Sequence, residues 1–482
     1  MAHVSHYGMT VAPRRLRGRV PGVPGSDPGA RETSIARARK SPPYLPLKVR
    51  RQSADKTGMS SIAVTEAALA ARAATLPAWP ADIRHIARQP ILDLHGRLHG
   101  YELLLEAGVD EDREARDPQA VRTILDDLVL FGFGRLTGGA LTFIPCTAEV
   151  LTEQLVTILP PAVTVLEIPH GLEMSPRLIA ACSILKNAGF RFLLDHFQCG
   201  GATNALLDLA DYVKVDFMPE DASEYSRLRA RLKGTTIAMM TGNVHSREAF
   251  RRAAAEGFSH FQGYYFCEPE PIENAKIPAN RLFHIEILRQ LFRDPLDLKE
   301  LCPLVMRDAS LVYRLLRLVN SPLCAVRSQV NSVEAAIVFL GENTFRRIAT
   351  LAIQCELSAG QPPEILHVSL VRARFCELAA PLAKMDPNEQ YLLGMFSLLP
   401  AMLRLPMETL AAELPLRPAV VEALLGTETP ERRLLAWIES LERCNFPACH
   451  RMARTGGLDN EQLKRLYLEA VVWDAAKPAI SA

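Results

Sequence analysis

The strongest constraint on the fold is a set of six apolar runs that recur at nearly even spacing. They are LTFIPC from residue 141, VTVLEI from 163, RFLLD from 191, YVKVDF from 212, TTIAMM from 235 and FSHFQGYYF from 258. Their starts differ by 22, 28, 21, 23 and 23 residues, the length of a strand, a helix and two short loops. This spacing predicts a parallel sheet in which a helix follows each strand.

The segments between these runs have helical patterns. In SREAFRRAAAEG, residues 246–257, Ser246 can cap a helix, Phe250 and Ala253 lie on one face with Ala254, and Gly257 can end it. Six or more such units closing on themselves predict a (β/α) barrel of the TIM type. An open doubly wound sheet is the alternative.

The strand pattern stops near residue 279, and helical spacing continues to the end of the chain. Three apolar faces carry this signal: Leu311, Leu315, Leu318 and Val319; Val333, Ala336, Ile337 and Leu340; and Phe345, Ile348 and Leu351. At 482 residues the chain is too long for one ordinary core. The predicted fold class is therefore α/β plus all-α, with a barrel at 81–278 and an all-helical domain at 279–482.

Residues 1–80 are predicted to be a disordered basic segment. Up to residue 58 they hold twelve basic residues and three acidic ones, and prolines and glycines interrupt any periodicity. Two interpretations stay open. The segment is a basic tail that contacts phosphates or lipid, or it precedes a true translation start at Met59.

Overall composition excludes several classes of protein. Lysine plus arginine number 55 and aspartate plus glutamate 54, so no global charge recruits nucleic acid or a membrane. No long apolar stretch or secretion signal is present, which predicts a cytoplasmic protein without a membrane span. Ten cysteines occur singly without a CxxC, and Cys444, Cys449 and His450 match no zinc spacing, so buried reduced thiols are expected.

Polar residues stand where several predicted strands end, and in a barrel these ends converge on one mouth. The candidate site residues are Glu102, Asp195, Lys214, Asp216 and Gln262, and Glu167 in VTVLEI is a further candidate. Lys214 and Asp216 share one strand face because side chains alternate. One acidic residue at a strand end is most often a helix cap or an ion pair, but recurrence in successive units indicates a site.

These motifs resemble two known families. The barrel part is similar to the EAL domain, the family of cyclic di-GMP phosphodiesterases, in ARQPILDLHGRLHGYELLL (87–105), LLDHFQCGG, YVKVD and FQGYYFCEP. The helical part resembles the HDOD domain in MRDASLVYRLLRLVNSPL and VNSVEAAIVFLGENTFRRIATLAI. YLLGMFSLLPAML (391–403) is similar to the subfamily that joins both domains.

The EAL resemblance implies a phosphodiesterase site with two divalent cations, magnesium or manganese, held by oxygen ligands. Glu102, Asp195, Lys214, Asp216 and Gln262 match family positions, whereas Pro145, His170, His196, Gly242 and His245 stand where ligands are expected. Glu106 replaces a phosphate-binding arginine. The matching positions are therefore expected to be vestigial, with no metal and no cofactor. A zinc site built from His170, His196 and His245 is a minor alternative.

The helical part lacks the adjacent His-Asp pair of HD hydrolases, and its histidines His284, His367 and His450 lie far apart in sequence. Catalysis there is not expected. The segment around Gly341, followed by Arg346 and Arg347, could form a helix-turn-helix, but a packed bundle with a basic edge is the favoured interpretation.

The sequence thus predicts a non-catalytic bacterial signalling protein that acts through protein–protein contacts of its HDOD domain. The resemblance links it to cyclic di-GMP or motility control. Neither cyclic di-GMP binding nor specific nucleic-acid binding is expected. The alternatives are a residual cyclic di-GMP phosphodiesterase that uses Glu102, Asp195, Asp216 and Lys214, and a receptor that binds cyclic di-GMP without hydrolysis.

Overall fold

The computed structural model describes residues 86–105, 125, 133–218, 222–268, 279–321, 329–414 and 416–475. The predictions for residues 1–80, for Met59 and for Glu106 lie outside the described residues. The chain divides into a unit of residues 1–58 and a unit of residues 59–482. All of the described residues belong to the second unit.

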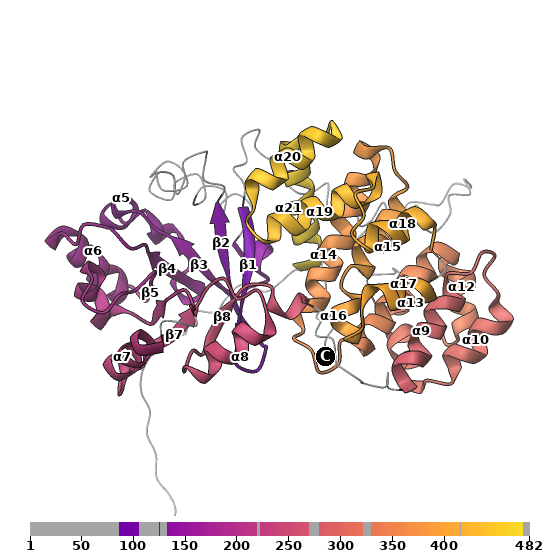
Figure 1. Ribbon diagram of the computed structural model, residues 1–482, viewed down its shortest axis with the longest axis horizontal. Helices are drawn as coiled ribbons and strands as arrows, with labels where there is room; N and C mark the ends of the chain where they lie inside the picture. Colours follow the sequence, from indigo (N-terminus) through magenta and orange to yellow (C-terminus); the bar gives the residue numbers. More distant parts are fainter. Residues whose placement is uncertain are drawn as a thin grey trace, which may run out of the picture. The chain divides into compact units, whose positions relative to one another are not determined.

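Eight strands form a closed barrel in chain order (Figure 1). They are β1 Ile86–Asp93, β2 Leu98–Leu105, β3 Leu141–Pro145, β4 Thr164–Ile168, β5 Arg191–Leu194, β6 Tyr212–Lys214, β7 Ala238–Thr241 and β8 His260–Gln262. Each of the six apolar runs contains one strand. The predicted barrel is confirmed, and the open-sheet alternative is wrong.

The first strand departs from the predicted parallel sheet. β1 pairs antiparallel with both β2 and β8, whereas the pairs from β2 to β8 are parallel. A tight turn joins β1 to β2: Asp93 accepts hydrogen bonds from the backbone N–H groups of His95 and Arg97, and Gly96 has a φ of 72°. So short a connection permits only antiparallel pairing, because a parallel pair needs a crossover of a dozen or more residues.

Helices and short 3-10 turns connect the remaining strands. The α-helices are α4 Phe133–Thr137, α5 Ala148–Thr152, α6 Pro176–Asn187, α7 Ala222–Leu232 and α8 Arg247–Ala255. Between β5 and β6 the connection is a 3-10 helix, Ala202–Leu209, in place of the predicted α-helix. Helix α8 forms as predicted: the Ser246 side chain accepts from the Ala249 N–H, and Gly257 has a φ of 91° after the last turn.

Two apolar layers hold the barrel together. Ile91, Phe143, Val165, Leu193, Tyr212 and Met240 form a buried cluster of their own. Their chain neighbours Leu92, Ile144, Leu166, Leu194 and Val213 belong to the larger core. Since successive side chains alternate across a strand, the first set fills the barrel interior and the second packs against the surrounding helices.

The rest of the described chain is helical (Figure 1). Its helices are α9 Ala279–Leu291, α10 Leu298–Met306, α11 Ala309–Val319, α12 Val333–Leu340, α13 Glu342–Leu357, α14 Glu364–Ala379, α15 Pro387–Phe396, α16 Leu399–Leu403, α17 Met407–Glu413, α18 Pro418–Leu424, α19 Pro430–Glu442, α20 Phe446–Gly456 and α21 Asn460–Ala475. The three predicted apolar faces are buried, with Leu318 half-buried. Gly341, with a φ of 75°, separates α12 from α13.

Buried polar contacts join the helical region to the barrel. The Tyr101 hydroxyl of β2 donates to Glu364 at 2.8 Å, and the Arg247 guanidinium of α8 donates to Gln361 at 2.8 Å. Helix α19 also contacts β1, and α21 contacts α4. Among the described helices none is long and apolar enough to cross a lipid bilayer.

Candidate active site at the barrel mouth

The mouth of the barrel is one residue layer beyond its apolar interior. A residue two positions from an interior residue on the same strand also faces inward. Two positions beyond Phe143, Val165, Leu193, Tyr212 and Met240 stand Pro145, Glu167, Asp195, Lys214 and Gly242. Glu102 on β2 and Gln262 on β8 belong to the same mouth, and antiparallel β1 adds Gln89, two residues before Ile91.

Lys214 draws the predicted carboxylates together. Its Nζ lies 2.9 Å from Glu102 Oε2, 2.6 Å from Glu167 Oε1 and 3.3 Å from Asp195 Oδ1. Burial acts to lower the pKa of Lys214, but the three carboxylates outweigh it and raise that pKa well above its usual value. Burial raises the pKa of Glu102 and of Glu167, and Lys214 opposes both shifts.

Glu167 is more central to this site than the sequence suggested. It is 3% exposed, and it contacts Lys214 more closely than any of the residues that matched the EAL family. Periodicity explains why this further candidate lies in the mouth. Glu167 follows the interior residue Val165 by two positions, as Asp195 follows Leu193 and Lys214 follows Tyr212.

His196 links the two aspartates of the mouth. Its Nδ1 lies 2.8 Å from Asp195 Oδ2, and its Nε2 lies 3.1 Å from Asp216 Oδ2. The His196 backbone is in the left-handed region, with a φ of 45°. Hydrogen bonds to Asp195 and Asp216 raise the pKa of His196 to about 10, so the ring is an imidazolium at neutral pH. Burial acts to raise the pKa of Asp195, but Lys214 and His196 lower it to about 2.

Oxygen atoms of Asp216 and Gln262 lie close to Gly242. A Cβ at Gly242 would lie 3.2 Å from Asp216 Oδ1 and 3.6 Å from Gln262 Oε1. Gln262 Oε1 and Glu167 Oε2 are buried and accept no hydrogen bond from any described residue. The mouth therefore presents free oxygen acceptors in addition to those that Lys214 and His196 occupy.

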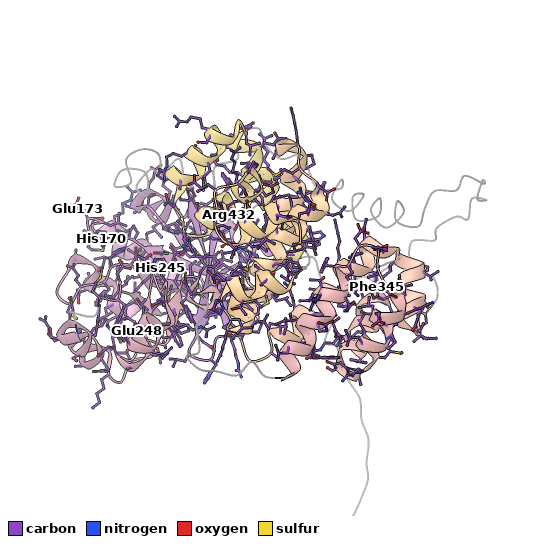
Figure 2. All side chains as sticks on the ribbon, turned by 45° about the vertical axis from the view of Figure 1, so that its right-hand side comes forward. His170, Glu173, His245, Glu248, Phe345 and Arg432 are labelled. Atoms are coloured by element: carbon purple, nitrogen blue, oxygen red, sulfur yellow. The ribbon has the colours of Figure 1, made fainter. Side chains whose placement is uncertain are left out.

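The remaining predicted positions separate into two groups. His170 lies beside His196, with 4.9 Å between the ring centroids. His245, labelled with His170 in Figure 2, lines a different cavity, of about 460 Å³, with Tyr264, Arg372 and other side chains. The structure therefore does not bring together the three histidines of the zinc alternative. Pro145 and Gly242 stand in the mouth layer but contribute no donor atom.

The mouth offers mainly oxygen atoms as possible metal ligands. Carboxylate and amide oxygens are the ligands that magnesium and manganese prefer. Four carboxylates, those of Glu102, Glu167, Asp195 and Asp216, outnumber the two cationic side chains, and Glu167 Oε2 and Gln262 Oε1 are free acceptors. These residues match a divalent cation in charge and in donor type, but no three His, Cys, Asp or Glu side chains of the described chain are already grouped to hold a metal ion. The predictions of vestigial positions and of no cofactor stay predictions.

The histidines of the helical region do not form a site. His284 pairs with Asp308 at 3.1 Å, and His367 pairs with Asp474 at 2.9 Å. His450 lies 3.2 Å from the Asn460 side-chain amide. Each of these three histidines therefore contacts different residues, as their wide spacing in the sequence indicated.

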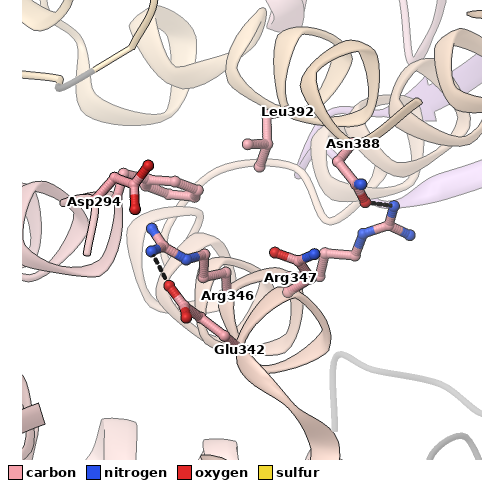
Figure 3. Close-up of a pocket in the computed structure, with 8 residues that line it drawn as sticks. Asp294, Glu342, Arg346, Arg347, Asn388 and Leu392 are labelled. Atoms are coloured by element: carbon pink, nitrogen blue, oxygen red, sulfur yellow. Dashed lines mark hydrogen bonds and ion pairs between the residues drawn. The ribbon is translucent and has the colours of Figure 1, made fainter. Parts of the chain in front are cut away.

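Arg346 and Arg347 line a cavity of about 390 Å³ with Phe292, Asp294, Glu342, Asn343, Asn388 and Leu392 (Figure 3). Arg346 pairs with Glu342 and donates to the backbone carbonyls of Leu291 and Arg293. Arg347 bonds to Asn388 and to Glu377, the latter at 2.6 Å. The expected basic edge is therefore a set of internally paired arginines around a hollow.

The helical region also matches a known family. Residues 277–405 match the family model described as HDOD domain. The chain carries an HDOD domain. The predicted pairing of a (β/α) barrel with an HDOD domain is thereby confirmed, and helices α17 to α21 follow the matched residues.

Two proteins are similar to this chain along most of its length. The cyclic di-GMP phosphodiesterase CdgJ of Vibrio cholerae is 29% identical over 402 residues, which are 81% of this chain and 92% of that protein. The uncharacterized protein YuxH of Bacillus subtilis is 29% identical over 399 residues, 80% of this chain and 97% of that protein. The expectation that this chain is not an enzyme is contradicted by the similarity to CdgJ, a named phosphodiesterase that it covers almost completely.

Solved EAL-domain structures resemble part of the chain. The EAL domain of Mycobacterium smegmatis DcpA has a TM-score of 0.32 and 18% identity, covering 38% of this chain and 90% of its own. The Bacillus subtilis YkuI protein, in complex with cyclic di-GMP and calcium, has a TM-score of 0.31 and 18% identity, covering 38% of this chain and 54% of its own. Similarities of this size carry no further argument.

Proposed function

We propose that this chain is a cyclic di-GMP signalling protein whose barrel hydrolyses a phosphodiester bond of cyclic di-GMP. The observation that carries the proposal is the convergence of Glu102, Glu167 and Asp195 on Lys214, with Asp216 and Gln262 beside them at one mouth. The similarity to CdgJ supplies the substrate and the class of reaction.

Hydrolysis needs a water oxygen to bond to phosphorus while the bond from phosphorus to a ribose oxygen breaks. The water gives up a proton, and the leaving ribose oxygen takes one. Burial raises the pKa of Glu102 and of Glu167, which favours proton uptake by these carboxyl groups. Lys214 orients both by its two short contacts.

A divalent cation held by Asp216 and Gln262, on either side of Gly242, would polarise the water and offset the phosphodiester charge. His196 holds Asp195 and Asp216 together at the same mouth. Asp195 also contacts Lys214, so its carboxylate joins the carboxylates around Lys214 to the His196–Asp216 pair.

Conversion of cyclic di-GMP to a linear dinucleotide, measured by chromatography with Mg²⁺ or Mn²⁺, tests the proposal. We expect Glu102→Gln to lower the rate by about 100-fold or more, because it removes a group that can transfer a proton. The control is Glu248→Gln, which changes an exposed glutamate of α8 that pairs with Arg252. A parent chain that binds cyclic di-GMP without turnover, or equal rates for the parent and Glu102→Gln, would refute the proposal.

We further propose that the HDOD domain contacts a protein partner at the hollow around Arg347. The Arg347 guanidinium lies at this hollow, bonded to Glu377 and over the Tyr391 ring at 4.6 Å. Arg347→Ala is a more specific test than Arg346→Ala, because Arg346 also donates hydrogen bonds to two backbone carbonyls. A pull-down from the native host should lose its partner with Arg347→Ala and keep it with Arg289→Ala, on the exposed side of α9. Retention by both variants would contradict this surface. A cytoplasmic location and the lack of nucleic-acid binding stay predictions.

A further inference from the structure

Gln89 links the barrel mouth to the end of helix α19. Its Nε2 donates to the backbone carbonyl of Glu442, the last residue of α19, at 3.1 Å and also lies 3.1 Å from Cys444 Sγ. Its Oε1 accepts from Gln262 Nε2 at 2.8 Å. Gln89 is 7% exposed and Gln262 is 5% exposed, so water does not compete freely for these bonds.

The Glu442 carbonyl fixes the direction of both amides. A carbonyl oxygen only accepts hydrogen bonds, so Gln89 must turn its NH₂ group toward it. The single amide oxygen of Gln89 then faces Gln262, which must present its own NH₂ group to Gln89. The Gln262 oxygen is left pointing the other way. The assignment of oxygen and nitrogen in both side chains follows from one backbone acceptor.

The Gln262 oxygen faces the mouth. It accepts no hydrogen bond from any described residue, and it lies next to Gly242, as does Asp216 Oδ1, which accepts from the Asn243 amide at 3.3 Å. With this orientation the Gln262 oxygen is an additional acceptor on this side of the mouth. If the Gln262 amide turned over, its NH₂ group would take the place of this oxygen, and the mouth would lose an oxygen ligand and gain a donor.

We propose that Gln89 is a positioning residue through which docking of α19 on β1 keeps the Gln262 oxygen turned toward the mouth. The inference deepens the proposed function, because it makes the helical region a regulator of the same site. Separation of α19 from β1 removes the carbonyl that orients Gln89. Both glutamines are then free to turn over, and the mouth binds a divalent cation less tightly.

Gln89→Leu tests this coupling because it keeps the approximate shape and removes both hydrogen bonds. The first readout is the side-chain amide signal of Gln262 in ¹⁵N-glutamine-labelled full-length chain, assigned by its loss in Gln262→Leu. We expect hydrogen exchange of this amide to be at least about tenfold faster in Gln89→Leu, since one buried hydrogen bond is lost. The second readout is Mn²⁺ affinity by calorimetry without dinucleotide, expected to fall about tenfold.

The control is Tyr101→Phe, which removes another buried hydrogen bond between the barrel and the helical region, the 2.8 Å bond to Glu364, but leaves the glutamine pair intact. It should change neither readout. In a Gln262→Leu background, Gln89→Leu should weaken Mn²⁺ binding no further, because Gln89 acts only through Gln262.

Parent-like exchange of the Gln262 amide in Gln89→Leu overturns the inference, and so does an additive loss of Mn²⁺ affinity in the double variant. Hydrogen exchange of the Gln262 amide tests the coupling between Gln89 and Gln262 whether or not the parent chain hydrolyses cyclic di-GMP. Absence of turnover in the parent, with fast exchange in Gln89→Leu, would refute the proposed function and leave the coupling standing.

Discussion

Replacing Lys214 with methionine should strongly destabilise the barrel. Methionine keeps the length of the side chain but removes the ammonium that contacts Glu102, Glu167 and Asp195 at 2.9, 2.6 and 3.3 Å. Breaking a buried ion pair by removing one partner costs about 3–5 kcal/mol. A separate estimate agrees: keeping one carboxyl with a usual pKa near 4.3 protonated at pH 7 costs about 3.7 kcal/mol, at about 1.36 kcal/mol per pH unit.

The same reasoning fixes the pH dependence of the effect. Without Lys214 the pKa of Glu102 and of Glu167 in the folded chain rises further above the unfolded value, since burial is then unopposed. A group of this kind stabilises the fold below its unfolded pKa and loses that contribution as pH rises through the folded pKa. At pH 5 the cost of holding one carboxyl protonated falls to about 1 kcal/mol. The Lys214→Met chain should therefore recover most of its stability relative to the parent between pH 7 and pH 5.

Urea unfolding followed by circular dichroism at pH 7 and pH 5 measures this effect. The matched control is Lys186→Met, which breaks a 2.6 Å pair with Asp211 whose two side chains are about a third exposed, and it should cost about 1 kcal/mol or less at both pH values. A loss below about 1 kcal/mol for Lys214→Met at pH 7, or a loss that does not change with pH, would refute the view that Lys214 is the central counter-ion of the mouth.

Two further predictions concern other parts of the chain. Burial, with His260 and Arg191 nearby, lowers the pKa of His99 to about 4, so the fold loses stability as pH falls from about 6.5 to 4; allowing for partial exposure, this is about 2 kcal/mol. His99→Leu should flatten the pH dependence of the melting temperature in that window, and an unchanged slope would contradict the assignment. Gly394→Ala should cost about 2–3 kcal/mol, because a Cβ would lie 2.6 Å from the Arg372 carbonyl oxygen and 2.7 Å from Ala373 Cα, both in the backbone of α14. Thermal unfolding should show no such loss for Gly456→Ala, whose nearest contact would be an ordinary 3.4 Å, and equal melting temperatures for the two variants would exclude close helix packing as the reason for Gly394.

The hydrophobic pattern determined the architecture. Even spacing of the apolar runs was enough to predict the strands from β3 to β8, because each run must be buried and each connection is long enough for a crossover. Helical periodicity likewise predicted the buried faces of α11, α12 and α13. The antiparallel direction of β1 was not predicted, since a tight turn inside ARQPILDLHGRLHGYELLL decides it locally.

The sequence also named six residues of the mouth, Glu167 among them, because polar side chains after buried strands converge in any closed barrel. Only the tertiary structure decided how they combine. Lys214, 112 residues along the chain from Glu102, neutralises it directly, and His196 fills the space between Asp195 and Asp216 instead of leaving a gap. The direction of the Gln262 amide depends on a backbone carbonyl at Glu442, which no local pattern connects with β8. Periodicity reports which side of a strand is buried, whereas charge pairing and hydrogen-bond direction depend on distances between segments that meet only after folding.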